Sequence, residues 1–243
     1  MMLAQSIRAV KILTLWLLAL LSWQLQANII VSGTRVIYAG SEKEITTKLS
    51  NTGSLPVLVQ SWIDDGDVNA NPDSIQVPFI LTPPINRINP NKSQTLRMSY
   101  SGTPALPEDQ ESVYWLNVLE IPALKEGTAA NRLQVAFRTR IKIFYRPAAL
   151  ADRAKASEAA EQLTWSVDGG QLKAINTSPY FVSLVSVTLK QGNRKSSVEG
   201  EMVAPRASKR FAVKDIALAR AGAVISYEYV NDWGAVKTVN YPL

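Results

Sequence analysis

The feature that most constrains the fold is a run near the middle of the chain, residues 131–147, which reads NRLQVAFRTRIKIFYRP. From Leu133 to Tyr145 its odd-numbered positions are apolar except Thr139, and its even-numbered positions hold all of its cations. Alternation with a period of two predicts a β-strand with one apolar face and one basic face. At about 3.3 Å per residue it would span about 50 Å, more than twice the usual length. Two interpretations remain open: an ordinary strand that faces its own core, or a strand that also serves a partner.

The first 27 residues differ in composition from the rest of the chain. Arg8 and Lys11 give a positive start, and residues 12–23 form an apolar run. This layout is typical of a secretory signal peptide, and the run is short for a transmembrane helix. We expect cleavage after Ala27, with the exact position left open because Leu25 is larger than usual before a cut. An uncleaved anchor is the alternative.

Composition excludes several classes of function. Loss of Arg8 and Lys11 lowers the formal net charge from +6 to +4, and the remaining cations are scattered, which disfavours nucleic-acid binding. The chain has no Cys, so an exported form would depend on its core and not on disulfides. It also has no His, the commonest general base and metal ligand. We therefore expect no enzyme activity, no metal and no cofactor. No second apolar segment is long enough to span a bilayer, so we expect no stable membrane insertion after cleavage.

Short strand-like runs separated by turn residues recur from Asn28 onward. The first set comprises 29–38, 45–49, 56–63, 79–81, 93–100, 112–121 and 131–147. The second set comprises 163–167, 172–176, 180–189, 197–203, 209–213, 223–230 and 235–241. This spacing predicts immunoglobulin-like β-sandwiches. We expect an all-β chain with a signal peptide (1–27), an N-terminal domain (28–149) and a C-terminal domain (150–243). Residues 151–162 are predicted to be a linker or a short helix, and 215–220 one helical turn.

The span 106–123, LPEDQESVYWLNVLEIPA, resembles the signature of the periplasmic chaperones that assemble bacterial pili by the chaperone–usher route, the PapD-like family. Further motifs agree: GTRVIY at 33–38, TPPINRI at 82–88, IKIFYRP at 141–147, NTSPYF at 176–181 and VNDWG at 230–234. The resemblance implies two immunoglobulin-like domains in a boomerang arrangement with an interdomain cleft. It also implies a cis X-Pro bond in the TPP segment, and Asn91 stands where a left-handed turn residue is expected.

The resemblance implies three sets of site residues. Arg35 and Lys142 match the pair that anchors the C-terminal carboxylate of a pilus subunit, a role suited to a guanidinium and a second cation; taken singly, each would be a surface cation. Leu133, Val135 and Phe137 match the side chains that the long strand donates to a subunit lacking its last strand. Phe137 is bulkier than is common there. Glu111, Arg146 and Asp232 match an interdomain salt-bridge network, and the alternative is three separate surface charges.

The implied function is that of a periplasmic chaperone that folds, caps and stabilises pilus subunits and delivers them to an outer-membrane usher. The short connection 122–130 and the absence of Cys resemble the short-loop branch of the family. Whether the free protein is a monomer or caps its own strand as a homodimer stays open. The alternative is a secreted two-domain adhesion or carbohydrate-binding protein. For that alternative the sequence offers only the loop acids Asp64, Asp65 and Asp67, a weak calcium-like cluster that we interpret as a solvated turn. Trp62, Trp115 and Trp165 are expected in the core.

Overall fold

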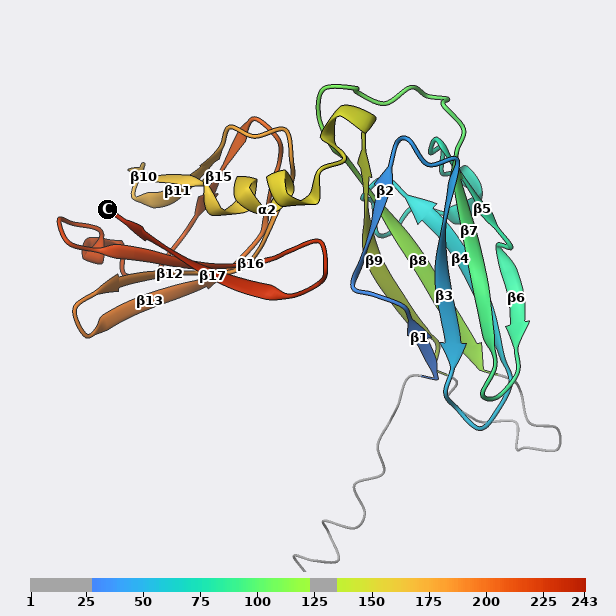
Figure 1. The fold of residues 1–243 in the computed structure, drawn as a ribbon. Coiled ribbons are helices and arrows are strands. Elements are labelled where there is room, and N and C mark those ends of the chain that lie inside the picture. The colour runs from blue at the N-terminus through green and yellow to red at the C-terminus, as the bar shows by residue number, and fades with distance from the viewer. Residues whose placement is uncertain (1–27, 123–134) are drawn as a thin grey trace, which may run out of the picture.

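The computed structural model describes residues 28–122 and 135–243. Two β-sandwiches lie at an angle to each other and are joined by a short segment that contains one α-helix (Figure 1). The predicted signal peptide and Leu133 lie outside the described residues. None of the helices in the described part of the chain has the length and apolar character needed to span a membrane.

The first sandwich consists of two sheets. One sheet has the order β1-β3-β7-β5, with β1 (Ile29–Val31), β3 (Glu44–Asn51), β7 (Ser93–Tyr100) and β5 (Phe79–Thr82). The other has the order β2-β9-β8-β4-β6, with β2 (Arg35–Ala39), β9 (Phe137–Arg146), β8 (Ser112–Pro122), β4 (Val57–Asp64) and β6 (Ile85–Ile88). Neighbouring strands are antiparallel except β2 and β9, which are parallel. A short 3₁₀ helix, η1 (Pro72–Ser74), lies in the loop after β4.

Alternate side chains of both sheets meet in the core of the first sandwich, as expected for period-two strands. Leu49, Leu96, Leu116 and Ile143 are fully buried there. The aromatic ring of Tyr38 joins the same cluster, and its hydroxyl accepts from the Tyr100 amide at 3.0 Å. This core fixes which face of β2 and β9 points outward, and so positions the site described below.

The predicted strand 29–38 is wrong in one respect, because the structure divides it between the two sheets. β1 pairs with β3, whereas β2 pairs with β9 in the opposite sheet. The switch occurs at residues 32–34, where Gly33 has φ +88°, a conformation that costs glycine little. β6, in the TPPINRI segment, was not predicted as a strand.

The long strand is shorter than predicted within the described residues. β9 begins at Phe137, and Val135 and Ala136 lie just before it without strand pairing. Ile143 and Tyr145 enter the core as the alternation predicts. The opposite face is not uniformly basic or solvated, because Phe144 and Arg146 are each 2% exposed. Both lie against the second sandwich, which the period-two pattern alone could not indicate.

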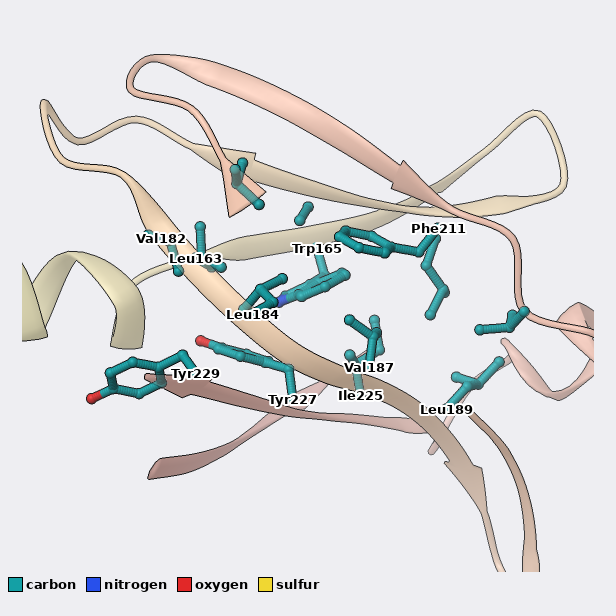
Figure 2. Close-up of a cluster of buried hydrophobic side chains, with 14 of the residues drawn as sticks. Leu163, Trp165, Val182, Leu184, Val187, Leu189, Phe211, Ile225, Tyr227 and Tyr229 are labelled. Atoms are coloured by element: carbon teal, nitrogen blue, oxygen red, sulfur yellow. The ribbon is translucent and has the colours of Figure 1, made fainter. Parts of the chain in front are cut away.

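The second sandwich follows η2 (Ala148–Leu150) and α2 (Arg153–Glu161). Its smaller sheet has the order β10-β11-β15, with β10 (Thr164–Asp168), β11 (Gln171–Asn176) and β15 (Ala207–Phe211). The larger has the order β13-β12-β16-β17, with β13 (Arg194–Glu199), β12 (Val182–Gln191), β16 (Val224–Val230) and β17 (Val236–Pro242). β14 (Met202–Val203) also pairs with β12, and η3 (Ile216–Leu218) is the expected helical turn. The rings of Phe211 and Tyr227 pack at tilted angles against Trp165 at the centre of this core (Figure 2).

The helix is held to the second sandwich by two tyrosines of β16. The Tyr227 hydroxyl donates to the Ala160 carbonyl at 2.9 Å, and the Tyr229 hydroxyl donates to the Glu161 carboxylate at 2.8 Å. Burial, together with the charge of Glu161, raises the pKa of Tyr227 to about 12. The segment predicted to be a linker or short helix is therefore an ordered helix that belongs to the second sandwich.

Several local expectations can be checked against the structure. The Thr82–Pro83 bond is cis, and Asn91 has φ +58°, as expected. The strand predicted at 197–203 is wrong: it is broken into β13 and β14 at Gly200, where an added Cβ would lie 2.4 Å from the Leu184 carbonyl carbon. Trp165 is buried as expected, but the core assignment is wrong for Trp62 and Trp115, which are only half-buried.

Candidate binding site

Arg35 and Lys142 are brought together by the parallel pairing of β2 with β9. They are direct register partners, although more than 100 positions separate them in sequence. Adjacent strands lie about 4.8 Å apart, so both side chains can reach one bound group. Their neighbours Val36 and Ile143 point into the core, which directs Arg35 and Lys142 to the outer face of the sheet.

Five cations of β2 and β9 lie on this outer face, and only two of them have an acidic partner; the exposed Arg138 donates to the Val68 carbonyl at 2.9 Å. Arg140 forms an ion pair with Asp64, and Arg146 forms ion pairs with Glu111 and Asp232. Among the described residues, no acidic side chain lies within ion-pair distance of Arg35 or Lys142. The result is a local excess of positive charge at the point where these two residues meet.

Part of the Arg35 guanidinium forms no hydrogen bond with the described residues. One terminal nitrogen, Nη1, donates to the Val230 carbonyl of the second sandwich at 2.8 Å, and the guanidinium lies 5.5 Å from the centre of the Phe144 ring. Its Nε is buried without a hydrogen-bond partner among the described residues. The guanidinium is thus held in place from one side while part of it is free to bind another acceptor. A carboxylate is the acceptor that fits such a geometry best.

The environment depresses the pKa of both residues. Burial lowers the pKa of Lys142, and the charges of Arg35 and Arg140 lower it further. Burial also lowers the pKa of Arg35, an effect that the charges of Asp232 and Glu111 partly offset. An arriving anion would reverse these shifts, because it favours the charged form of each cation. The site therefore gains most from a ligand that carries a negative charge.

The edge of β9 is open beside this pair of cations. β2 covers β9 only from Lys142 to Arg146, whereas β8 pairs with β9 from Phe137 to Tyr145. Residues 137–141 consequently have no strand on the β2 side among the described residues. Such an edge presents unpaired backbone donors and acceptors to any extended chain.

Two of the three residues predicted to be donated lie at the start of this edge. Val135 is 48% exposed and Phe137 is 45% exposed, which is high for large apolar side chains. Neither belongs to the core of the first sandwich. Leu133 lies outside the described residues, so its prediction is not tested.

The three residues predicted to form a salt-bridge network lie together between the sandwiches. Arg146 donates from Nη2 to Glu111 Oε1 at 2.7 Å and from Nη1 to Asp232 Oδ2 at 2.8 Å. The other Glu111 oxygen accepts from the Phe181 amide at 2.8 Å. Asp232 and Phe181 belong to the second sandwich, so the network crosses the junction. Burial raises the pKa of Glu111, an effect that the charge of Arg146 opposes.

Sequence reasoning missed a second polar network on the same sheet. Asp64 is 1% exposed, and it accepts from Asn117 Nδ2 at 2.5 Å and from Arg140 Nε at 3.1 Å. Arg140 also lies 4.6 Å from the centre of the Trp115 ring. The interpretation of Asp64 as part of a solvated turn is therefore wrong. The signal in the sequence was the position of Asp64 directly after the predicted strand 56–63. The structure places this residue beside Arg140 of the basic run 131–147.

Comparisons with known proteins agree with this architecture. Residues 28–151 match the family described as "Pili and flagellar-assembly chaperone, PapD N-terminal domain". Residues 158–241 match "Pili assembly chaperone PapD, C-terminal domain". The probable fimbrial chaperone YadV of Escherichia coli K12 is 41% identical over 215 residues, which is 86% of this chain and 87% of YadV.

Solved structures give the same result. The Pseudomonas aeruginosa CupB2 chaperone superposes with a TM-score of 0.75 at 38% identity, covering 88% of this chain and all of that one. A structure of the Salmonella enterica SafA pilin in complex with the SafB chaperone matches with a TM-score of 0.73 at 25% identity, covering 90% of this chain and 98% of that one.

The chain belongs to the PapD-like family of pilus-assembly chaperones. It has the chaperone function of this family, which is favoured over the alternative of an adhesion or carbohydrate-binding protein.

Proposed function

We propose that the protein is a non-enzymatic periplasmic chaperone that binds pilus subunits along the open edge of β9 and holds their C-terminal carboxylate with Arg35 and Lys142. The observation that carries this proposal is the coincidence of an open strand edge with two cations that lack acidic partners. The open edge of β9 would form backbone hydrogen bonds with the subunit. Arg35 and Lys142, at the end of this edge, would neutralise the C-terminal carboxylate of the subunit.

The geometry predicts the direction of the bound strand. A subunit strand that pairs with residues 137–141 would occupy the same side of β9 as β2 does. One end of this added strand would then lie next to Arg35 and Lys142. For the C-terminal carboxylate to reach both cations, this end must be the C-terminal one. The added strand therefore runs parallel to β9, in the same direction as β2.

Apolar side chains at the start of β9 and just before it in the sequence would supply the second part of the binding energy. Val135 and Phe137 are exposed in the free protein, and Leu133 continues the same alternation. Burial of each in an apolar groove of the subunit would contribute about 1.5–3 kcal/mol, which the cost of ordering both partners partly offsets. Phe137 would favour a wider groove than a smaller aliphatic residue would.

Further elements of the proposal concern export and partners. Residues 1–27 would direct export and be removed, leaving an N-terminal domain (28–149) and a C-terminal domain (150–243). The relation to SafB, which was solved in complex with the SafA pilin, supports pilus subunits as partners. Delivery to an outer-membrane usher is part of the proposal, as the resemblance to the family implies. In the absence of a subunit, the open edge would remain free in a monomer or pair with a second copy in a homodimer.

Co-expression with a candidate subunit tests the proposal. The wild-type chaperone should raise the periplasmic level of the subunit and co-purify with it. Loss of one charge-assisted contact in Lys142→Ala or Arg35→Ala should lower the yield of complex about tenfold or more. The matched control is Lys190→Ala, which removes an exposed cation from β12 in the other sandwich. Wild-type yields from folded Lys142→Ala and Arg35→Ala would contradict the anchor, and a subunit level independent of the chaperone would contradict the function.

A further inference from the structure

An acidic side chain points into the first sandwich at one end of its core. Glu120 follows Leu116 and Val118 on the inward face of β8, and it is only 3% exposed. Its register partners are Val59 on β4 and Phe137 on β9, neither of which carries charge. A buried carboxylate destabilises a protein unless it is hydrogen-bonded and matched by a cation. The inward position of Glu120 therefore indicates that it needs hydrogen-bond donors and a cation close by.

Glu120 differs from the other buried carboxylates of the described residues. Asp64 is paired with Arg140, and Glu111 is paired with Arg146. Glu120 accepts from Asn28 Nδ2 at 2.6 Å and from the Ile29 amide at 3.1 Å. No described cation lies within ion-pair distance of it. Both of its hydrogen bonds come from the first two residues that follow the predicted cleavage point.

Asn28 is held firmly beside Glu120. Its carbonyl accepts from the Thr52 amide at 2.8 Å, and Gly53 is packed so closely that an added Cβ would lie 2.2 Å from Asn28 Oδ1. The start of β1 and the end of β8 lie at the same end of the sandwich (Figure 1). Lys48 on the adjacent β3 is exposed on the outer face of its sheet.

We propose that Glu120 is the binding site for the α-ammonium group of Asn28, created when residues 1–27 are removed. Hydrolysis of the Ala27–Asn28 peptide bond by water leaves a carboxylate on Ala27 and an amine on Asn28, which takes up a proton at neutral pH. This nitrogen is one peptide unit from the Ile29 amide that already donates to Glu120. The new positive charge therefore arises beside the one buried carboxylate that lacks a cation among the described residues.

The site couples maturation to stability. In the precursor the nitrogen of Asn28 belongs to a neutral amide, and Glu120 stays buried without a cation. Cleavage would supply this charge beside Glu120, so we expect the mature form to be more stable than the precursor. A less stable precursor would be easier to keep unfolded for export. This inference rests on the proposed signal cleavage, but not on subunit binding.

The direct test is the pKa of the α-amino group in protein that begins at Asn28. An unperturbed α-amino group has a pKa of about 7.7–8.0, and a nearby carboxylate raises it. We expect a rise of about one unit or more, a tenfold change in proton affinity, that disappears in Glu120→Gln. Titration of the ¹⁵N-labelled terminus by NMR measures both values. Equal values in the two proteins would overturn the proposal.

A second measurement does not depend on a substitution in the core. Protein that begins at Asn28 is compared with protein that retains Ala27, which displaces the ammonium by about 3.8 Å. Because the folded-state pKa is raised, the extra stability is present below about pH 8 and is lost as pH rises through the folded pKa. The urea midpoint of the Asn28 form should therefore exceed that of the Ala27 form at pH 7, and the two should converge near pH 10.

Equal urea midpoints at pH 7 would contradict the coupling. Mass spectrometry of the exported protein tests the cleavage itself, and a first residue other than Asn28 would also overturn the proposal. Subunit yield in co-expression depends on Arg35, Lys142 and β9 and not on the ammonium site at Glu120. This yield therefore tests the proposed chaperone function independently of the ammonium site.

Discussion

At the scale of single residues, the outer face of the β2-β9-β8 sheet is organised by which cations have acidic partners. Arg140 and Arg146 are neutralised by buried or nearly buried acids, whereas Arg35 and Lys142 are not. Arg140 is paired with Asp64 and lies 4.6 Å from the centre of the Trp115 ring. Arg35 and Lys142 therefore form the proposed anion site, whereas Arg140 is already paired with Asp64.

Asp64 also predicts a dependence of stability on pH. Burial alone would raise the pKa of Asp64, but hydrogen bonds from Arg140, Asn117 and the Gly66 amide outweigh burial and lower it. Because the folded-state pKa is depressed, the stabilisation is present above the unfolded value of about 3.9 and is lost as pH falls through the folded value. Urea midpoints of wild type and Asp64→Asn should differ at pH 7 and approach each other below about pH 4. A difference that stays constant across this range would contradict the assignment.

The role of a residue could be predicted from the sequence only where the residue lies in a motif that resembles the family. Arg35 and Lys142 could be paired through flanking motifs, although nothing in their spacing places them on adjacent strands. Asp64 and Glu120 were not predicted to be buried, because burial of an acid depends on what the fold brings opposite it. For Glu120 the signal was present: an acid in phase with the apolar positions Leu116 and Val118.

At the scale of elements, β9 has two halves with different partners. Its second half lies between β2 and β8 and contributes Ile143 and Tyr145 to the core. Among the described residues its first half pairs with β8 alone, and Phe137 there and Val135 just before it are exposed. The two interpretations of the long alternating run were therefore not exclusive, since one strand serves its own sheet at one end and is available at the other.

The difference between the two halves of β9 predicts how a charged side chain at position 135 would affect folding and subunit binding. Val135→Asp should leave a folded, soluble protein, because Val135 is 48% exposed and outside the core. It should lower the yield of co-purified subunit about tenfold or more, since an unpaired carboxylate would have to enter an apolar groove. Thermal unfolding and co-purification measure the two effects.

The matched control for this change is Val167→Asp. Val167 is a 45% exposed valine of β10 in the other sandwich, and its replacement should preserve subunit binding. Unfolding of Val135→Asp would assign this residue to the protein's own core. Normal subunit yield from the folded variant would contradict its role in the proposed strand.

Element boundaries show what alternation cannot predict. Residues 29–38 form an uninterrupted β-prone stretch, yet β1 and β2 pair in opposite sheets. The choice depends on partners distant in sequence, Asn51 and its neighbours for β1 and Lys142 and its neighbours for β2. Most other strands lie within a few residues of their predicted positions, because their turns are marked by Gly, Pro and Asn.

At the scale of the whole molecule, the angle between the sandwiches is held by contacts of several kinds. Arg146 joins Glu111 to Asp232, and the Glu111 amide donates to the Pro179 carbonyl at 2.9 Å. The rings of Phe144 and Phe181 face each other across the junction with centroids 6.2 Å apart. Two domains were predictable from the repeated strand pattern, but their relative position depends on these few side chains.

The arrangement matters because Arg35 is itself part of the junction. Its guanidinium donates to Val230, which lies two residues before Asp232 in the second sandwich. Movement of one sandwich relative to the other would therefore displace Arg35, a proposed anchor residue that belongs to the first sandwich. The interdomain network and the proposed anion site share no residue, but Arg35 links them through its hydrogen bond to Val230.

Asp232→Ala tests this connection. Arg146 keeps its pair with Glu111 but loses its acidic partner across the junction, which should cost about 1–3 kcal/mol. Each sandwich retains its own core, so calorimetry should resolve two unfolding transitions that lie closer together in the wild type. The control is Asp215→Ala, which removes an exposed ion pair with Arg194 inside the second sandwich and should cost about 0–1 kcal/mol. Subunit yield should fall in Asp232→Ala and not in the control, because only the former frees the backbone that holds Arg35. A variant that separates the transitions but binds subunits normally would show that the anion site does not need a fixed angle between the sandwiches.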